Sequence, residues 1–255
     1  MMKDLTWLKK EYIAHRGLHT RDQTIPENSK KAFQNALKHG YAIECDLNIL
    51  KDGTVVVFHD KDLNRLCGLD QKLSELTFED IKDKKILKSD ETIMRFDELL
   101  SLVGGKVPLL IELKPFGDTQ KLCEEVAKHL DAYPHAYAIF SFHPNIVYWF
   151  KKHRPNVIRG QISEYFRLDK HMNPLMKYGM KSLFFNRFTK PDFISYGIHD
   201  LPNKYCDRAF KKGMTVISYA AKNQDELDFV RSTYHNVVFE HFIPKKERDC
   251  NEMKI

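Results

Sequence analysis

Residues 41–47 read Tyr-Ala-Ile-Glu-Cys-Asp-Leu, an apolar run that two carboxylates interrupt at alternate positions. Successive side chains of a β-strand point to opposite faces, so Glu44 and Asp46 share one face. Residues 109–114 repeat the pattern, because Glu112 and Lys114 end a Leu-Leu-Ile run two positions apart. Carboxylates on the inward face of a buried strand are costly without a cation. The alternative is an edge strand whose charges face solvent.

Comparable apolar runs recur along the whole chain and alternate with helical patterns. The strand-like runs are 12–15, 41–47, 107–113, 136–141, 157–162, 182–185, 214–219 and 236–240. The main helical patterns are 28–39, 118–131, 143–153, 202–213 and 223–234. Eight strands alternating with helices predict an α/β fold of the (β/α)8 TIM barrel type. A doubly wound open sheet would need a glycine-rich phosphate loop after its first strand, and neither GxGxxG nor GxxxxGK[ST] occurs.

The longest departure from this alternation follows the second strand. Asp52-Gly53 suits a two-residue hairpin turn, and the run 54–58 after it is rich in β-branched residues. Thr77 and Asp80 have the spacing of a helix capping box, and a second helical pattern at 96–103 stops at two glycines. We interpret residues 1–255 as a single domain with a small insertion at about 48–105.

The register of this hairpin predicts which side chains meet. If Asp52 and Gly53 are the central turn residues, Asp46 lies directly across from His59. Side chains that are opposite each other on an antiparallel pair share a face, so a histidine would join the Glu44 and Asp46 pair. A slip of one residue would put the two side chains on opposite faces.

A second histidine ends the first strand, in the sequence His15-Arg16-Gly17. A lone histidine on an apolar strand is most often structural, but its neighbours favour a functional interpretation. Gly17 permits a sharp exit from the strand, and Arg16 offers a planar fork that suits a phosphate. The three carboxylates suit a hard divalent ion, Mg²⁺ or Ca²⁺, and no Cys/His cluster indicates zinc. Together these residues predict a metal-assisted phosphate site.

Composition narrows the class of protein. The net charge is +6, and the basic residues are spread along the sequence, which argues against a nucleic-acid footprint. Five cysteines without CxxC spacing indicate a reducing compartment and no disulfide framework. The N-terminus lacks a signal-peptide core, and no apolar run approaches a membrane span. We therefore expect a cytoplasmic protein with no stable membrane insertion and leave its oligomeric state open.

The ordered set of motifs resembles the glycerophosphodiester phosphodiesterase family over nearly the whole chain. The motifs are Ile13–Gly17, Pro26-Glu27-Asn28-Ser29, Ile43–Asp46, Asp52-Gly53, Val57–Asp60, Leu63-Asn64-Arg65, Ile111–Lys114 and Ser141-Phe142. The resemblance implies a (β/α)8 barrel with a small insertion. The implied roles are one divalent cation on Glu44, Asp46 and Glu112, an acid–base pair of His15 and His59, and phosphate binding by Arg16 and Lys114. The implied reaction is metal-dependent hydrolysis of a small glycerophosphodiester to sn-glycerol 3-phosphate and an alcohol.

The sequence departs from the family pattern near its end. The penultimate strand usually carries Trp-Thr and here has Tyr219-Ala220, and the last usually ends in Thr-Asp and here has Glu240-His241. These positions would lie at the barrel mouth, so they affect substrate selectivity before catalysis.

Two alternative functions stay open at this stage. A phospholipase-type enzyme acting on lipid phosphodiesters would need an apolar rim, which the sequence alone does not indicate. A catalytically silent binding module is the other alternative. It is disfavoured by the complete carboxylate triad and by the presence of both histidines.

Overall fold

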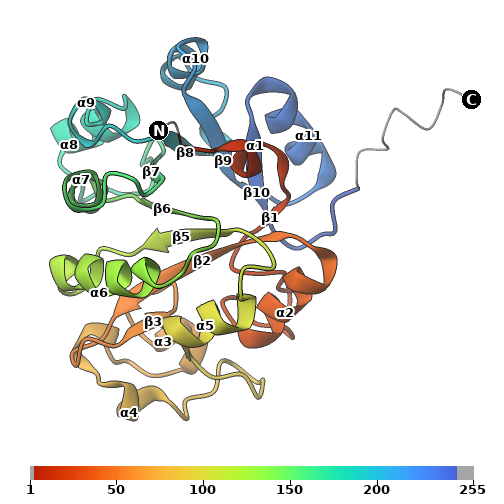
Figure 1. The fold of residues 1–255 in the computed structure, drawn as a ribbon, viewed down its shortest axis with the longest axis vertical. Helices are drawn as coiled ribbons and strands as arrows, with labels where there is room; N and C mark the ends of the chain where they lie inside the picture. The colour runs from red at the N-terminus through yellow and green to blue at the C-terminus, as the bar shows by residue number, and fades with distance from the viewer. Residues whose placement is uncertain (1–2, 246–255) are drawn as a thin grey trace, which may run out of the picture.

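The computed structural model describes residues 3–245, and within them eight parallel strands close into a barrel (Figure 1). The barrel strands are β1 (Ile13–Ala14), β2 (Ala42–Ile49), β5 (Leu109–Leu113), β6 (Tyr137–Ser141), β7 (Arg159–Ser163), β8 (Phe193–Gly197), β9 (Thr215–Ala221) and β10 (Asn236–Phe239). The first strand pairs with both β2 and β10, which closes the ring. The predicted TIM barrel is therefore confirmed.

Helices cover the outside of the barrel between successive strands, and a further short helix precedes the first strand. They are α1 (Thr6–Lys10), α2 (Lys30–His39), α5 (Phe96–Val103), α6 (Thr119–Asp131), α7 (Pro144–His153), α8 (Pro174–Lys181), α9 (Asn186–Thr189), α10 (Lys204–Lys211) and α11 (Gln224–Thr233), with a 3₁₀ turn η2 (Ile198–Asp200). Local signals fix their ends: the Ser29 hydroxyl accepts from the N–H of Ala32 at the start of α2, and Gly40 ends that helix with φ 69°. The five main predicted helices are present, with ends shifted by a few residues. No helix between residues 3 and 245 combines the length and apolar character needed to cross a bilayer.

One predicted strand is wrong. Residues 182–185 form turns between α8 and α9, and Leu183 has φ 61°. The aromatic ring of Phe185 packs against α8, where a Cβ on Gly179 would be 2.6 Å from it. The barrel strand in this part of the chain is β8, whose five residues are all buried. A four-residue apolar run cannot by its pattern be told from a helix end, and here it packs between helices.

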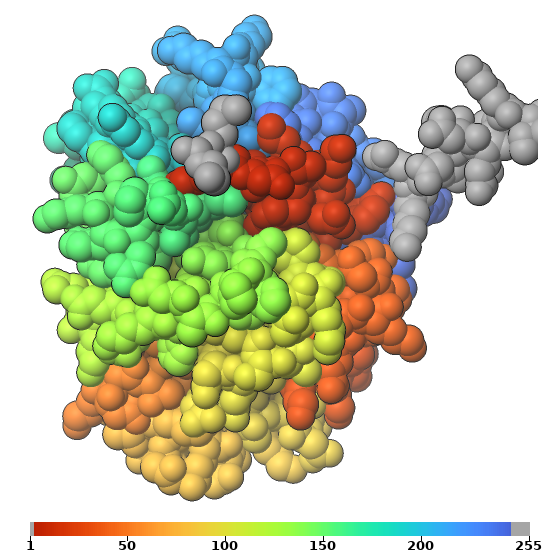
Figure 2. All heavy atoms as spheres, in the orientation of Figure 1, coloured from red at the N-terminus to blue at the C-terminus, as the bar shows by residue number. Residues whose placement is uncertain are grey.

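The insertion after β2 is built on a short antiparallel extension of the sheet. Its elements are β3 (Val55–Val57), α3 (Asn64–Cys67), η1 (Leu73–Glu75), α4 (Phe78–Ile81) and β4 (Met94–Arg95). Their apolar side chains form a separate cluster that includes Val56, Phe58 and Ile81. The predicted capping box is present, because the N–H of Thr77 donates to the Asp80 carboxylate at 2.8 Å. These elements form the orange and yellow end of the molecule in Figures 1 and 2.

The predicted hairpin register is wrong by one residue. Leu47 pairs with Val57, and the N–H of Leu50 donates to the carbonyl of Thr54 at 2.9 Å. The loop therefore has three residues and ends on Gly53 with φ 92°, a left-handed position that a three-residue loop requires. Asp46 lies across from Phe58, whose N–H donates to the Asp46 carbonyl at 2.9 Å. His59 follows beyond the end of β3.

The inside of the barrel has an apolar lower part and a charged mouth. Ala42 on β2 and Leu110 on β5 belong to the interior cluster, together with Phe140 and Leu8 of α1. Residues two positions further along these strands point the same way. Glu44 and Glu112 therefore point into the barrel directly above the apolar layer, and the edge-strand alternative is wrong.

Candidate active site

Three carboxylates from adjacent strands meet inside the barrel mouth. Glu44 and Asp46 lie on β2, and Asp46 is the register partner of Glu112 on β5. Each offers an oxygen, and these oxygens lie within 4.8 Å of one another. All three side chains are buried. The structure thus brings together the residues that the sequence proposed as metal ligands.

The charges within this cluster are unequally balanced. Burial, with Asp46 and Glu112 nearby, raises the pKa of Glu44 well above its usual range. Burial alone would also raise the pKa of Asp46, but Lys114 and Arg16 hold it well below its usual range. For Glu112, burial outweighs the effect of Lys114, and its pKa is raised. Glu44 Oε1 has no hydrogen-bond partner among residues 3–245, whereas Lys114 contacts Asp46 and Glu112.

Two cationic side chains contact the carboxylates. Lys114 Nζ lies 2.9 Å from Asp46 Oδ1 and 2.7 Å from Glu112 Oε1. Arg16 Nε lies 3.2 Å from Asp46 Oδ2. Although burial opposes it, the surrounding carboxylates, Asp46 first, raise the pKa of Arg16, so its guanidinium stays charged.

A left-handed backbone turn at the end of β1 places Arg16 beside the carboxylates. Arg16 has φ 53°, and its N–H donates to Glu44 Oε2 at 2.8 Å. Gly17 follows with φ 75°, and a Cβ there would lie 2.8 Å from the backbone of Ala32. Only glycine fits this close approach to α2, which explains the Arg16-Gly17 sequence.

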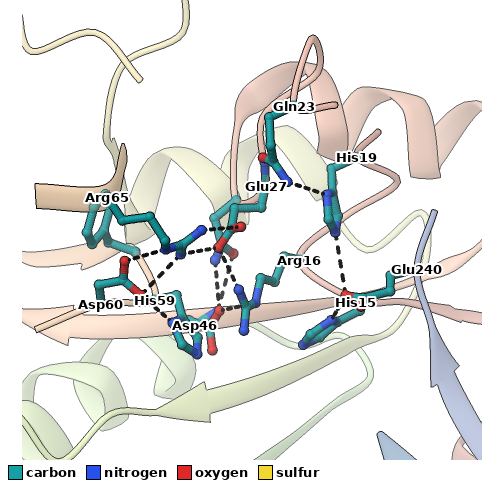
Figure 3. Close-up of polar contacts among 12 residues, drawn as sticks. His15, Arg16, His19, Gln23, Glu27, Asp46, His59, Asp60, Arg65 and Glu240 are labelled. Atoms are coloured by element: carbon teal, nitrogen blue, oxygen red, sulfur yellow. Dashed lines mark hydrogen bonds and ion pairs between the residues drawn. The ribbon is translucent and has the colours of Figure 1, made fainter. Parts of the chain in front are cut away.

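His15 is held by a carboxylate from the last strand. Its Nδ1 lies 2.6 Å from Glu240 Oε2, and its Nε2 lies 3.9 Å from Glu44 Oε2 (Figure 3). Burial, and then the charge of Arg16, lower the pKa of His15 to about 4 despite Glu240. The imidazole is therefore neutral at pH 7. A carboxylate at Nδ1 favours the tautomer that carries its proton there and leaves the Nε2 lone pair facing the cluster.

His59 is held in the same manner by a different network. Its Nδ1 lies 2.6 Å from Asp60 Oδ1, and Asp60 accepts from Arg65 at 2.7 Å. Arg65 in turn makes two bonds of 2.8 Å to Glu27. Figure 3 shows His15 and His59 on either side of the Arg16 guanidinium. His59 reaches the site although the predicted register was wrong. It lies beyond the end of β3, so the alternation of the strand does not fix its direction.

Three residues that support the site were not singled out from the sequence. Asn28 Nδ2 donates to Asp46 Oδ2 at 2.8 Å, and Glu27 accepts from Arg16 Nη1 at 2.6 Å. Burial would raise the pKa of Glu27, but Arg65 and Arg16 lower it to about 2. Both residues stand in the Pro-Glu-Asn-Ser motif, which was the available signal. Glu240 was noted only as a departure from the family pattern.

A pocket of about 230 Å³ opens beside His15 at the mouth. Its lining includes His15, Glu164, Asp200, Tyr219, Lys222 and Glu240. The Tyr219 hydroxyl lies 3.1 Å from Glu164 Oε2. Tyr219, Ala220 and Glu240, three of the four positions at which the sequence departs from the family pattern, therefore line this pocket.

In TIM-barrel enzymes the active site lies at the carboxyl ends of the strands, and this barrel gathers its charged groups at that end. Residues 15–244 match the glycerophosphoryl diester phosphodiesterase family, and the chain belongs to that family.

Individual relatives agree with this assignment over part of their length. A glycerophosphodiester phosphodiesterase of Caldanaerobacter subterraneus subsp. tengcongensis is 33% identical over 130 residues, covering 50% of this chain and 49% of the relative. A human lysophospholipase D is 29% identical over 127 residues, covering 45% of this chain and 38% of the relative. The matched part of the chain thus spans about half, or less, of the length of these relatives.

A solved structure agrees over nearly the whole fold. A phosphodiesterase of Oleispira antarctica, in complex with the product sn-glycerol-3-phosphate, superposes with a TM-score of 0.78 at 18% identity. The match covers 92% of this chain and 94% of that one. At this identity the likeness concerns the fold.

Proposed function

We propose that the protein hydrolyses glycerophosphodiesters to sn-glycerol 3-phosphate and an alcohol in a metal-dependent reaction. The observation that carries the proposal is the group of three buried carboxylates beside Arg16 and Lys114. Arg16 lies between two histidines, each of which is held by a carboxylate of its own. The fold shared with a phosphodiesterase that holds sn-glycerol-3-phosphate supports the same substrate class.

One divalent cation, Mg²⁺ or Ca²⁺, would be held by Glu44, Asp46 and Glu112. The donor set consists of carboxylate oxygens, which are the ligands these ions prefer. The unpartnered Oε1 of Glu44 and the raised pKa of that residue agree with a missing positive charge. When bound, the cation would stabilise the negative charge that develops on the phosphoryl oxygens.

Arg16 and Lys114 would bind the phosphate. A phosphodiester carries a negative charge that the carboxylates would otherwise repel. Glu27 holds one end of the Arg16 guanidinium, and Lys114 sits between Asp46 and Glu112. Both cations are fixed before substrate arrives, so little ordering is needed when the charge develops.

His15 and His59 would transfer the protons. One would take the proton of the attacking oxygen, and the other would protonate the leaving alkoxide. Glu240 would be a positioning residue for His15, because its carboxylate fixes the tautomer and the ring orientation. Asp60 would do the same for His59.

The alcohol would occupy the pocket beside His15. Three carboxylates, of Glu164, Asp200 and Glu240, outnumber the one ammonium group, of Lys222, in its lining. Tyr219 supplies an aromatic ring. Such a lining favours a cationic head group such as choline or ethanolamine. Because the human relative is named a lysophospholipase D, a second candidate function is hydrolysis of lipid-bearing phosphodiesters at the same site.

We also propose that the reaction takes place in the cytoplasm. Cys45, Cys67, Cys123 and Cys206 are free, as a reducing compartment would keep them. Cys250 lies outside the described residues.

The test is release of sn-glycerol 3-phosphate from glycerophosphocholine and glycerophosphoethanolamine, with Mg²⁺, with Ca²⁺ and with EDTA. We expect release with a metal and none with EDTA. Absence of release with every metal would reject the proposal and leave lipid substrates or a binding role.

A further inference from the structure

Residues 165–190, here called the α8–α9 segment, concentrate the exposed apolar side chains of the molecule. They hold six of the eleven exposed large apolar residues between positions 3 and 245: Leu168, Leu175, Met176, Tyr178, Phe184 and Phe188. Leu168 is 95% exposed and Leu175 is 82% exposed. Leucines this exposed gain nothing from the fold, and gathered apolar side chains mark a surface that contacts something.

The same segment is strongly basic. It contains six lysines and arginines and one acidic residue, Asp169, so it carries +5 of the chain's net +6. Cations lie over several of the exposed rings: the Arg187 guanidinium is 3.8 Å from the Phe184 ring centroid, and Lys181 Nζ is 5.8 Å from that of Tyr178. Exposed leucines and aromatic rings interleaved with basic groups match the interface of an anionic bilayer. An acidic protein or a nucleic acid would match the charge but would leave the leucines in water.

The segment begins at the barrel mouth. It follows β7 and Glu164, and Glu164 lines the pocket beside His15. The N–H of Tyr165 donates to Asp200 Oδ2 at 2.6 Å, and Arg167 pairs with Asp200, which lines the same pocket. Leu168 is the next residue along the chain. Leu168 therefore directly follows a residue that is paired with the lining of the pocket.

Further contacts hold the start of α8 near this loop. Lys177 Nζ donates to the Asp169 carbonyl at 2.7 Å. Gly179 and Met180 are buried, while Leu175, Met176 and Tyr178 stay exposed, so α8 is anchored by one side only. In Figure 1 α8 and α9 form the upper left corner of the molecule, and the turquoise spheres there in Figure 2 belong to this segment.

We propose that the protein docks peripherally on anionic lipid bilayers through the α8–α9 segment. Leu168, Leu175 and Met176 enter the headgroup region, and the lysines and arginines pair with lipid phosphates. The contact brings the barrel mouth to the lipid headgroups. This proposal goes beyond the hydrolysis proposed above and does not depend on it.

The experiment is sedimentation of the full chain with phosphatidylcholine vesicles, with and without phosphatidylglycerol, in low and high salt and without substrate. We expect binding to the phosphatidylglycerol vesicles that weakens with salt. The affinity of the double variant Leu168→Asp/Leu175→Asp should fall by about tenfold or more, because two inserted apolar side chains become anionic. The matched control is Leu87→Asp, at a leucine that is 41% exposed in the insertion, and it should bind as the wild type does.

Three results would overturn the proposal. They are no binding of the wild type to phosphatidylglycerol vesicles in low salt, equal binding by the double variant, or a dimer in solution that the double variant disperses. The dimer would assign the surface to a second copy of the chain. Thermal unfolding of both variants checks that they fold. Hydrolysis of soluble glycerophosphocholine, measured in parallel, should not differ between the wild type and the double variant, and its absence in both would count against the proposed activity alone.

Discussion

Replacement of Glu44 by glutamine should raise the stability of the barrel and at the same time remove a ligand of the proposed cation. Glutamine has the shape of glutamate and keeps an oxygen that can accept from the N–H of Arg16. It removes one of three buried carboxylates whose mutual repulsion no metal relieves in EDTA. We therefore predict that Glu44→Gln is more stable than the wild type in EDTA and no longer responds to metal.

The size of the effect follows from the spacing of the charges. Two carboxylate oxygens 4.8 Å apart repel by about 3 kcal/mol at an effective dielectric constant of about 20. Glu44 faces two such neighbours, and the attraction of Arg16 offsets part of this cost. We expect a net gain of about 1–3 kcal/mol in the free energy of unfolding at pH 8. For the wild type, a cation at a hundred times its Kd would add about 2.7 kcal/mol.

The gain should depend on pH. The pKa of Glu44 is raised in the folded state, so the folded protein binds this proton more tightly than the unfolded chain does. The stability linked to this proton is complete below the unfolded pKa of about 4.3 and is lost as pH rises toward the folded pKa. Glutamine has no such proton. The difference between variant and wild type should therefore widen through this window.

The assay is urea unfolding in EDTA and in Ca²⁺ or Mg²⁺, at several pH values. Glu125→Gln is the control, at a partly exposed glutamate paired with Lys128, and it should change the free energy of unfolding by less than about 0.5 kcal/mol. A Glu44→Gln protein that is less stable than the wild type in EDTA at pH 8 would refute the electrostatic reasoning. A full metal response in that variant would refute the assignment of the ligand.

Three further predictions concern catalysis and packing. His15→Ala and His59→Ala should fold normally and lose about 10²–10⁴-fold in kcat, and near-normal turnover in either would remove that histidine from the mechanism. Glu240→Gln should lower kcat by about 10- to 100-fold with little change in KM or metal affinity, whereas an unchanged kcat would leave it no positioning role. Gly160→Ala should cost about 1–3 kcal/mol in unfolding experiments, because its Cβ would lie 2.3 Å from the Phe193 ring, and a neutral effect would show that the ring moves freely.

Much of the fold and of the candidate site could be predicted because both depend on the period of the strands. Glu44, Asp46 and Glu112 interrupt apolar runs at alternate positions, and this spacing alone requires a shared face. The strands β2 and β5 are neighbours in the barrel, so the two groups meet. Local capping signals located the helices because these signals act within a few residues of the helix ends.

What could not be predicted depends on contacts between distant segments. The hairpin was misjudged because Asp-Gly serves a two-residue or a three-residue loop, and packing of Phe58 in the insertion decides between them. Glu240 lies 225 residues from His15, and no local pattern pairs them. The exposure of Leu168 and Leu175 could not be predicted, because it depends on how the folded chain places their side chains relative to the core.

The most direct test of the proposed function is the rate of sn-glycerol 3-phosphate release from glycerophosphocholine as Mg²⁺ or Ca²⁺ is titrated, in the wild type and in Asp46→Asn. Asp46 contacts Arg16, Lys114 and Asn28, so its carboxylate joins the metal ligands to the phosphate-binding cations. We predict a saturable rise for the wild type that EDTA abolishes, and no rise for the variant. Release that persists in EDTA, or an equal rise in Asp46→Asn, would contradict the account.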